Sequence, residues 1–201
     1  MLMTGTDRRW WIGISKTLRG HFLIAGPRLR DTNFFKSVVL IFEHGTEGAM
    51  GVVINRPSSI CVAHALGAHF KLPQTDDVVY VGGPVEPNAL FIVHSADELS
   101  EGETPILPGL YVGTNAEVFE EVVERALCDD DGLPFRVYCG CAGWGPGQLE
   151  GELDRGDWLT IPADMDYLFD DSPYCVWERL VAKLQEKHRL LPHRCDNPEW
   201  N

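Results

Sequence analysis

Short apolar runs rich in β-branched residues follow one another along the chain from residue 21 onward. Glycine, proline and asparagine bound these runs, which is the pattern typical of β-strands. Eight runs predict strands, at residues 22–25, 37–43, 49–54, 78–81, 90–93, 110–112, 135–141 and 158–161. So many strands exclude an all-helical protein.

The second and third predicted strands are joined by a short polar connection. It reads Glu43-His44-Gly45-Thr46-Glu47-Gly48. A connection of this length is too short for a helical crossover and suits an antiparallel hairpin. The pattern therefore predicts an α+β domain rather than a doubly wound α/β sheet.

Apolar residues spaced three and four apart predict helices elsewhere. The clearest helix covers residues 116–127, with Thr114 or Asn115 as its cap and glutamates on its polar face. A second runs from residue 174 to about 189 after Pro173. A shorter helix is predicted at residues 146–153, and residues 62–66 add one more turn.

The length of 201 residues and the hydrophobic content of 44% indicate one domain with a sizeable core. We place this single domain at residues 20–190, between an N-terminal arm (1–19) and a C-terminal tail (191–201). The arm carries Trp10 and Trp11, which either pack on the domain or belong to a loose extension. The tail contains prolines and polar residues and is expected to fray.

Charge is distributed unevenly along the chain, whose net charge is −13. Residues 1–36 hold seven Lys and Arg against two acidic residues, while the remainder holds 10 basic and 28 acidic residues. An acidic body repels phosphate backbones, and no pair of short helices with a basic second member is present. We therefore expect no direct binding to nucleic acid.

Features of secretion and membrane insertion are missing from the sequence. No apolar window approaches the roughly 18 residues of a membrane-spanning helix, and Lys16 and Arg19 interrupt the N-terminal apolar stretch. Six scattered cysteines do not resemble a compact disulfide framework. We expect a cytoplasmic protein with reduced thiols, either a monomer or a small homo-oligomer.

Five segments together carry a resemblance to one bacterial family. They are Gly20-His21-Phe22-Leu23-Ile24-Ala25-Gly26-Pro27, residues 35–44, Gly48-Ala49-Met50-Gly51-Val52-Val53-Ile54-Asn55-Arg56-Pro57, Tyr80-Val81-Gly82-Gly83-Pro84-Val85 and Gly143-Trp144-Gly145-Pro146-Gly147-Gln148-Leu149-Glu150. The chain resembles the YqgE/AlgH family from about residue 20 to about residue 187. Members of this family are also described as proposed transcriptional regulators.

The resemblance implies an α+β fold with a mainly antiparallel, bifurcated sheet. Part of that sheet is expected to close into a small barrel, with helices around it. The resemblance implies no reaction, because the family has no established mechanism or agreed ligand. The regulator label describes a role in gene expression and does not identify a DNA-binding surface.

Two constellations could carry chemistry. Cys139 and Cys141 lie two apart in a predicted strand, so both side chains would share one face, either as soft-metal or redox ligands or as a buried inert pair. His44 and His94 each follow an apolar strand and, with Glu43, either meet at one end of the sheet or simply mark strand ends. Neither set reaches four zinc ligands at the usual spacing, so we expect no metal and no cofactor.

The remaining candidates lie in turns. The glycine-rich segment 143–150 precedes a helix and either binds an anion or permits tight backbone turns around Trp144. It lacks the spacing of phosphate and dinucleotide loops. Arg56 could bind an anionic ligand, although pairing with a neighbouring carboxylate is the favoured interpretation.

Two hypotheses of function follow. The first is a non-catalytic regulatory or binding protein that acts through a protein partner or small ligand and affects transcription indirectly; no catalytic signature is present. The second is a small-molecule-binding protein or enzyme whose site combines strand ends with the 143–148 loop. Its predicted ligand-binding residues are Asn55, Arg56, Gly82, Gly83, His94, Trp144 and Gln148.

Overall fold

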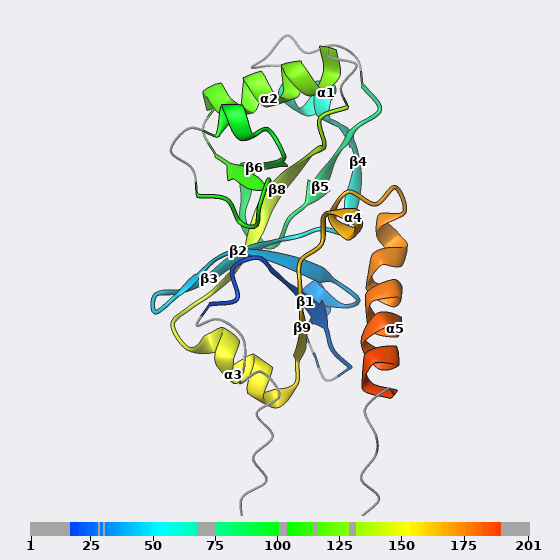
Figure 1. Ribbon diagram of the computed structural model, residues 1–201. Helices are drawn as coiled ribbons and strands as arrows, with labels where there is room; N and C mark the ends of the chain where they lie inside the picture. The colour runs from blue at the N-terminus through cyan, green and yellow to red at the C-terminus, as the bar shows by residue number, and fades with distance from the viewer. Residues whose placement is uncertain are drawn as a thin grey trace, which may run out of the picture.

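A computed structural model describes residues 17–27, 29, 31–67, 75–100, 104–114, 116–128 and 132–189. Within these residues nine strands form one sheet with helices around it (Figure 1). The strands are β1 (His21–Ala25), β2 (Val38–Gly45), β3 (Gly48–Val53), β4 (Pro57–Cys61), β5 (Val78–Val81), β6 (Val85–His94), β7 (Tyr111–Gly113), β8 (Phe135–Trp144) and β9 (Trp158–Pro162).

Five α-helices and three short 3-10 turns complete the described fold. The helices are α1 (Val62–Leu66), α2 (Ala116–Cys128), α3 (Gln148–Arg155), α4 (Met165–Leu168) and α5 (Val176–Arg189). The 3-10 turns are η1 (Thr32–Phe34), η2 (Asp97–Leu99) and η3 (Pro173–Cys175). Gly147 and Gly156 flank α3 in the left-handed conformation, and the Gly156 N–H closes the helix on carbonyls of its last turn.

Strand β8 joins the two parts of the sheet. Its first half lies between β5, which runs parallel to it, and β6, which runs antiparallel. Its last residues pair instead with β3, which leads through β2 and β1 to β9 at the other edge. Gly140, with φ of 72°, lies between these two sets of pairings. Figure 1 shows β8 running from the part covered by α1 and α2 toward the part that carries α3.

Three clusters of buried side chains fill the fold. One lies between α2 and the sheet and includes Ile92, Phe119 and Val137. A second lies beneath α3 and contains Trp144 and Trp158. The largest is central and joins residues of both parts of the sheet with the apolar face of α5. The two parts of the sheet therefore share one continuous interior.

Most predicted elements are confirmed. All eight predicted strands and the four predicted helices are present, and the 43–48 connection forms an antiparallel hairpin in which Gly45 pairs with Gly48. Strand β4 and helix α4 were not predicted. The expected small barrel is not closed. Strand β4 forms one edge of the sheet, and no pairing among the described residues joins β4 to β7. The fold is a mixed α+β domain with an open, branched sheet.

The beginning of the described chain is attached to the body by side-chain hydrogen bonds. The Arg19 guanidinium donates to the carbonyl oxygens of Phe42, Thr104 and Pro105. The Leu18 N–H donates to His44 Nδ1 over 3.0 Å. The tryptophans of the N-terminal arm and the C-terminal tail lie outside the described residues. No helix in the described part is long and apolar enough to cross a membrane.

Candidate functional site

Asn55 and Arg56, both predicted to bind a ligand, are engaged with the backbone of a neighbouring loop. Asn55 is 6% exposed; its Oδ1 accepts from Val38 N–H at 2.9 Å and its Nδ2 donates to the Lys36 carbonyl at 2.9 Å. The Arg56 guanidinium donates to the carbonyl oxygens of Asn33 and Phe35. Both side chains fix the 33–38 segment beside the start of β4, so their polar groups serve the structure of the fold.

Gly82 and Gly83 serve a close approach of two strands. A Cβ atom on Gly82 would lie 2.2 Å from the Gly140 carbonyl oxygen, and one on Gly83 would lie 2.2 Å from the Cys141 backbone. The Gly82 N–H donates to Cys139 O, and its carbonyl accepts from Val53 N–H. These glycines are required where β5 ends and the sheet branches, and they offer no side chain to a ligand.

His94 and His44 lie at opposite ends of the sheet, so the hypothesis that they meet is wrong. His44 pairs with Ala49, which pairs with Trp144 at the end of β8, while His94 pairs with Phe135 at its start. Ten residues of strand separate these positions, a span of about 30 Å. The branching of the sheet around β8 could not be foreseen from the runs alone.

His94 is completely buried. Its Nδ1 accepts from Ala96 N–H at 3.3 Å, its ring stacks on Tyr111 at 5.8 Å, and its Nε2 has no partner among the described residues. Burial lowers the pKa of His94 from 6.5 to about 4, which keeps the ring neutral near pH 7. A neutral ring packed in this way is a core residue.

Trp144 and Gln148 belong to a network centred on Glu152 of α3. One carboxylate oxygen of Glu152 accepts from the indole N–H groups of both Trp144 and Trp158, at 2.8 Å each. The other accepts from Gln148 Nε2 at 3.0 Å, while Gln148 Oε1 caps the Gly145 N–H. No side chain caps the first N–H groups of α3, but Glu150 in its first turn and the nearby Glu152 make this end of the helix acidic, which disfavours an anion there.

Cys139 and Cys141 do not share one face, contrary to the expectation from strand alternation. Cys141 is buried in the central cluster, whereas Cys139 packs against the cluster beneath α2. The left-handed Gly140 between them interrupts the regular pleat. Burial raises the pKa of the Cys141 thiol, which keeps it protonated and unreactive.

The seven predicted residues therefore do not form one site. Asn55, Arg56, Gly82 and Gly83 lie near one another along the backbone, but their polar atoms are used internally. Trp144 ends β8 near Gln148 of α3, and His94 ends β6 beside the start of β8.

A cavity of about 590 Å³ lies elsewhere, beside the first residues of β5 and β8. Its walls come from four places: α1 and α2, the segments that lead into β5 and β8, the strands themselves, and the loop after α4. The lining residues are Val62, Asp76, Asp77, Val78, Tyr80, Ala126, Gly132, Leu133, Pro134, Phe135, Arg136, Val137, Phe169, Asp170 and Asp171. This volume is in the range of small-molecule sites.

Arg136 connects the walls of the cavity. Its guanidinium lies 4.6 Å from the centre of the Tyr80 ring and donates to the carbonyl oxygens of Asp170, at 2.5 Å, and Ile54, at 3.5 Å. It thereby links β8 to the loop after α4 and to the end of β3. The stacking and the bonds position the ring of Tyr80 against the cavity.

The hydroxyl group of Tyr138 lies on the same side of the sheet. Tyr138 is the register partner of Tyr80 in the parallel pair and follows Arg136 by two residues, so the three side chains share a face. It is completely buried, and its hydroxyl lies close to the Arg136 side chain, without a hydrogen bond of normal geometry to any described residue. Burial raises the pKa of Tyr138, while the charge of Arg136 and its interaction with the hydroxyl lower it. Arg136 therefore provides the polar surroundings of this hydroxyl.

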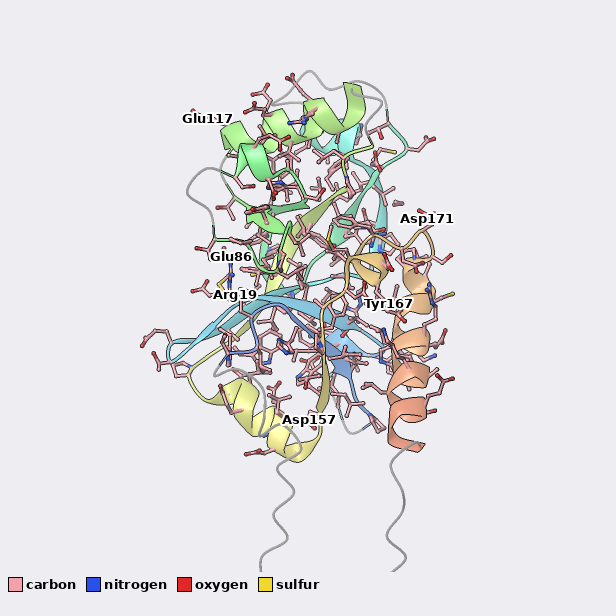
Figure 2. All side chains as sticks on the ribbon, viewed as in Figure 1. Arg19, Glu86, Glu117, Asp157, Tyr167 and Asp171 are labelled. Carbon is pink, nitrogen blue, oxygen red and sulfur yellow. The ribbon has the colours of Figure 1, made fainter. Side chains whose placement is uncertain are left out.

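Asp170 is the best-anchored acidic residue of the cavity. Its carboxylate accepts from Ser172 N–H at 2.8 Å and pairs with Arg179. These contacts, the backbone hydrogen bond first, lower the pKa of Asp170. Figure 2 shows Asp171, its neighbour, on the loop between α4 and α5, on the side of the molecule that carries β4 and β5.

The lining residues were missed because they are distant in sequence and individually ordinary. A weak signal was the occurrence of Asp-Asp dipeptides at 76–77 and 170–171, each next to an apolar run. The parallel pairing of β5 with β8 brings the segments before these two strands together, and the Arg136 hydrogen bond to Asp170 brings in the loop after α4. The described lining residues include no Ser, Thr, Cys, His or Lys, and no group of three or more His, Cys, Asp or Glu side chains in the described chain could hold a metal ion.

Comparisons with known proteins give a consistent result. A family model described as AlgH-like matches residues 22–189. A UPF0301 protein from Chlorobium chlorochromatii is 31% identical over 186 residues, covering 92% of this chain and 96% of the relative. One from Thioalkalivibrio sulfidiphilus is 37% identical over 174 residues, covering 85% of this chain and 91% of the relative.

Two solved structures are similar as well. The solution structure of the AlgH protein from Pseudomonas aeruginosa is 35% identical, with a TM-score of 0.68 and coverage of 86% of this chain and 89% of that one. The crystal structure of protein DIP2367 from Corynebacterium diphtheriae is 25% identical, with a TM-score of 0.67 and coverage of 82% and 85%.

Proposed function

The chain belongs to the AlgH-like family, and from this premise we propose that it is a non-catalytic binding protein that takes a small organic ligand in the cavity beside β5 and β8. The observation that carries this proposal is the cavity itself, whose wall combines apolar side chains with Tyr80, Arg136 and four aspartates. A cavity of this size that combines apolar side chains with several polar groups can hold a small organic molecule.

The composition of the wall favours binding over catalysis. Of the side chains that act as nucleophiles, the described lining residues offer only carboxylates and the Tyr80 hydroxyl, with no Ser, Cys, Thr or Lys and no His to act as a base beside them. General acid catalysis by a carboxyl group near pH 7 needs a raised pKa, whereas the contacts of Asp170 lower its pKa. The cavity is therefore suited to hold a molecule.

A regulatory role fits a binding protein of this kind. The net charge of −13 disfavours direct contact with nucleic acid, so any effect on transcription would pass through a ligand or a protein partner. Arg136 would transmit ligand binding from the cavity to other parts of the fold, because its hydrogen bonds join the cavity to the end of β3 and to the loop before α5. The free thiols of Cys61, Cys139, Cys141 and Cys175 support a reducing compartment such as the cytoplasm.

A thermal-shift screen tests the proposal. Small amines, carboxylates, sugars and nucleotides are added to the wild-type protein and to Ala126→Trp, in which a bulky side chain on α2 would occlude the cavity. Ala126→Ser is the matched control at the same position. We expect at least one compound to raise the Tm of the wild type and of Ala126→Ser but not of Ala126→Trp. Stabilisation that survives in Ala126→Trp would contradict the proposal.

A further inference from the structure

The first described residues of the chain are bound to a histidine at the end of β2. The Leu18 N–H donates to His44 Nδ1 over 3.0 Å, and the Thr17 hydroxyl donates to the His44 carbonyl oxygen over 3.2 Å. On the other side of the ring, His44 Nε2 lies 3.0 Å from Glu150 Oε1 of α3. One imidazole ring, 10% exposed, therefore joins the start of the described chain to α3.

These contacts determine where the proton of the ring lies. Because the Leu18 N–H donates to Nδ1, this nitrogen is an acceptor, and the single proton of the neutral ring is on Nε2, which donates it to Glu150. A second proton would occupy Nδ1 and would place two donors 3.0 Å apart. The bond to Leu18 would then be lost, whereas the contact with Glu150 would become a charge-assisted ion pair.

The charged groups around His44 act in opposite directions. Glu150 of α3 favours the charged ring, and so do the exposed Glu43 and Glu47 of the β2–β3 hairpin. The Arg19 guanidinium opposes it, because it binds the β2 backbone two residues before His44. Strand β3, which pairs with β2 here, contains no titratable side chain. Histidine is the side chain that ordinarily changes its charge between about pH 5 and 8.

A second histidine lies near the same segment. His21 of β1 is 8% exposed, and its Nδ1 lies 3.4 Å from the Arg19 carbonyl oxygen. The guanidinium of Arg19 is held separately, by three backbone carbonyl oxygens. Loss of the bond to His44 would therefore release Leu18 while Arg19 stays attached to the body.

We propose that His44 is a proton-sensitive attachment point for the N-terminus. The neutral ring holds residues 17–18 beside α3, and the protonated ring releases them and keeps only its contact with Glu150. The bond controls where residues 1–16, which carry the tryptophans and the basic residues of the N-terminal arm, join the body. This device is independent of the cavity and of the proposed function.

NMR of the ¹⁵N-labelled full-length protein between pH 7.5 and 5.5 tests the proposal. Long-range ¹H–¹⁵N correlations report the tautomer and the protonation of the His44 and His21 rings separately. The amide shift and the heteronuclear NOE of Leu18 report its attachment, and the amides of β1 show that the fold stays intact. His44→Gln removes the titrating ring, and His64→Gln, at an exposed position of α1, is the matched control.

We expect the neutral His44 ring to carry its proton on Nε2. As this ring takes up a second proton, the Leu18 amide proton should move upfield and its NOE should fall, while the amides of β1 keep their shifts. His64→Gln should behave like the wild type, and Leu18 of His44→Gln should not respond to pH in this range. The ring and the amide are compared within the wild type, so the test does not depend on the folding of His44→Gln.

Four results would overturn the proposal. They are a proton on Nδ1 of the neutral His44 ring, a ring that stays neutral down to pH 5.5, a Leu18 amide that keeps its shift while His44 is protonated, and a Leu18 response that follows the His21 ring or persists in His44→Gln.

Discussion

The buried His94 makes stability depend on pH in a calculable way. Its folded-state pKa is about 4 and its ordinary value is 6.5, and burial alone is the cause. The unfolded chain therefore binds more protons than the folded chain between these values. The contribution of neutral His94 to the free energy of unfolding is complete above pH 6.5 and is lost as the pH falls toward 4.

The size of the effect follows from the two pKa values. Between pH 7.5 and pH 5 the linkage relation gives a loss of about 2 kcal/mol in the free energy of unfolding from this residue. The lowered pKa of Asp170 acts at lower pH, because its ordinary value is 3.8. The effects of His94 and Asp170 on stability can therefore be separated, because they appear in different pH ranges.

The assay is urea denaturation of the wild type and of His94→Asn at pH 7.5, 6.5, 5.5 and 5.0. Asparagine keeps an acceptor for the Ala96 N–H but cannot titrate, so the variant is less stable at pH 7.5 yet loses less stability on acidification. The difference in the free energy of unfolding between the two proteins should narrow by about 2 kcal/mol by pH 5. An equal dependence of unfolding free energy on pH in both proteins, or an NMR titration of His94 with a midpoint near 6.5, would refute the reasoning.

Three further substitutions, one of them with a matched control, test the structural network. Glu152→Ala leaves two indole N–H groups without their acceptor and should cost about 2–4 kcal/mol in urea denaturation followed by tryptophan fluorescence; a loss below about 0.5 kcal/mol would show that the bridge contributes little. Gly82→Ala places a methyl group 2.2 Å from the Gly140 carbonyl and should prevent stable folding, whereas Gly45→Ala, with nothing within 4 Å, should change Tm by only a few degrees. Asn55→Ala should cost about 2–3 kcal/mol by chemical denaturation, because both of its backbone partners lose a hydrogen bond.

The sequence was a good guide to elements whose residues interact locally. The glutamate-rich helix α2 and the β2–β3 hairpin depend on spacing and turn length, and both were predicted correctly. Strand β4 was missed because it begins with Pro57 and continues with two serines, a composition tolerated at a sheet edge. Helix α4 was missed because four residues provide too little periodicity.

The site was harder to predict because it depends on pairings between distant segments. Tyr80 and Tyr138 become neighbours only through the parallel register of β5 and β8, which are separated by β6, β7 and α2 in sequence. The turn residues chosen from sequence, such as Asn55 and Gly82, do lie at strand ends. Their polar atoms are nevertheless consumed by the backbone, since a branched sheet needs such groups to hold its segments together.

Native mass spectrometry of gently purified protein tests the central claim most directly. The wild type and Ala126→Trp are expressed in the same cells, isolated in parallel and measured without denaturation. Binding in the cavity predicts a stoichiometric small-molecule mass on the wild type that is absent from Ala126→Trp. A wild-type protein that carries no added mass, or the same mass on both proteins, would contradict the assignment of this cavity as the ligand site.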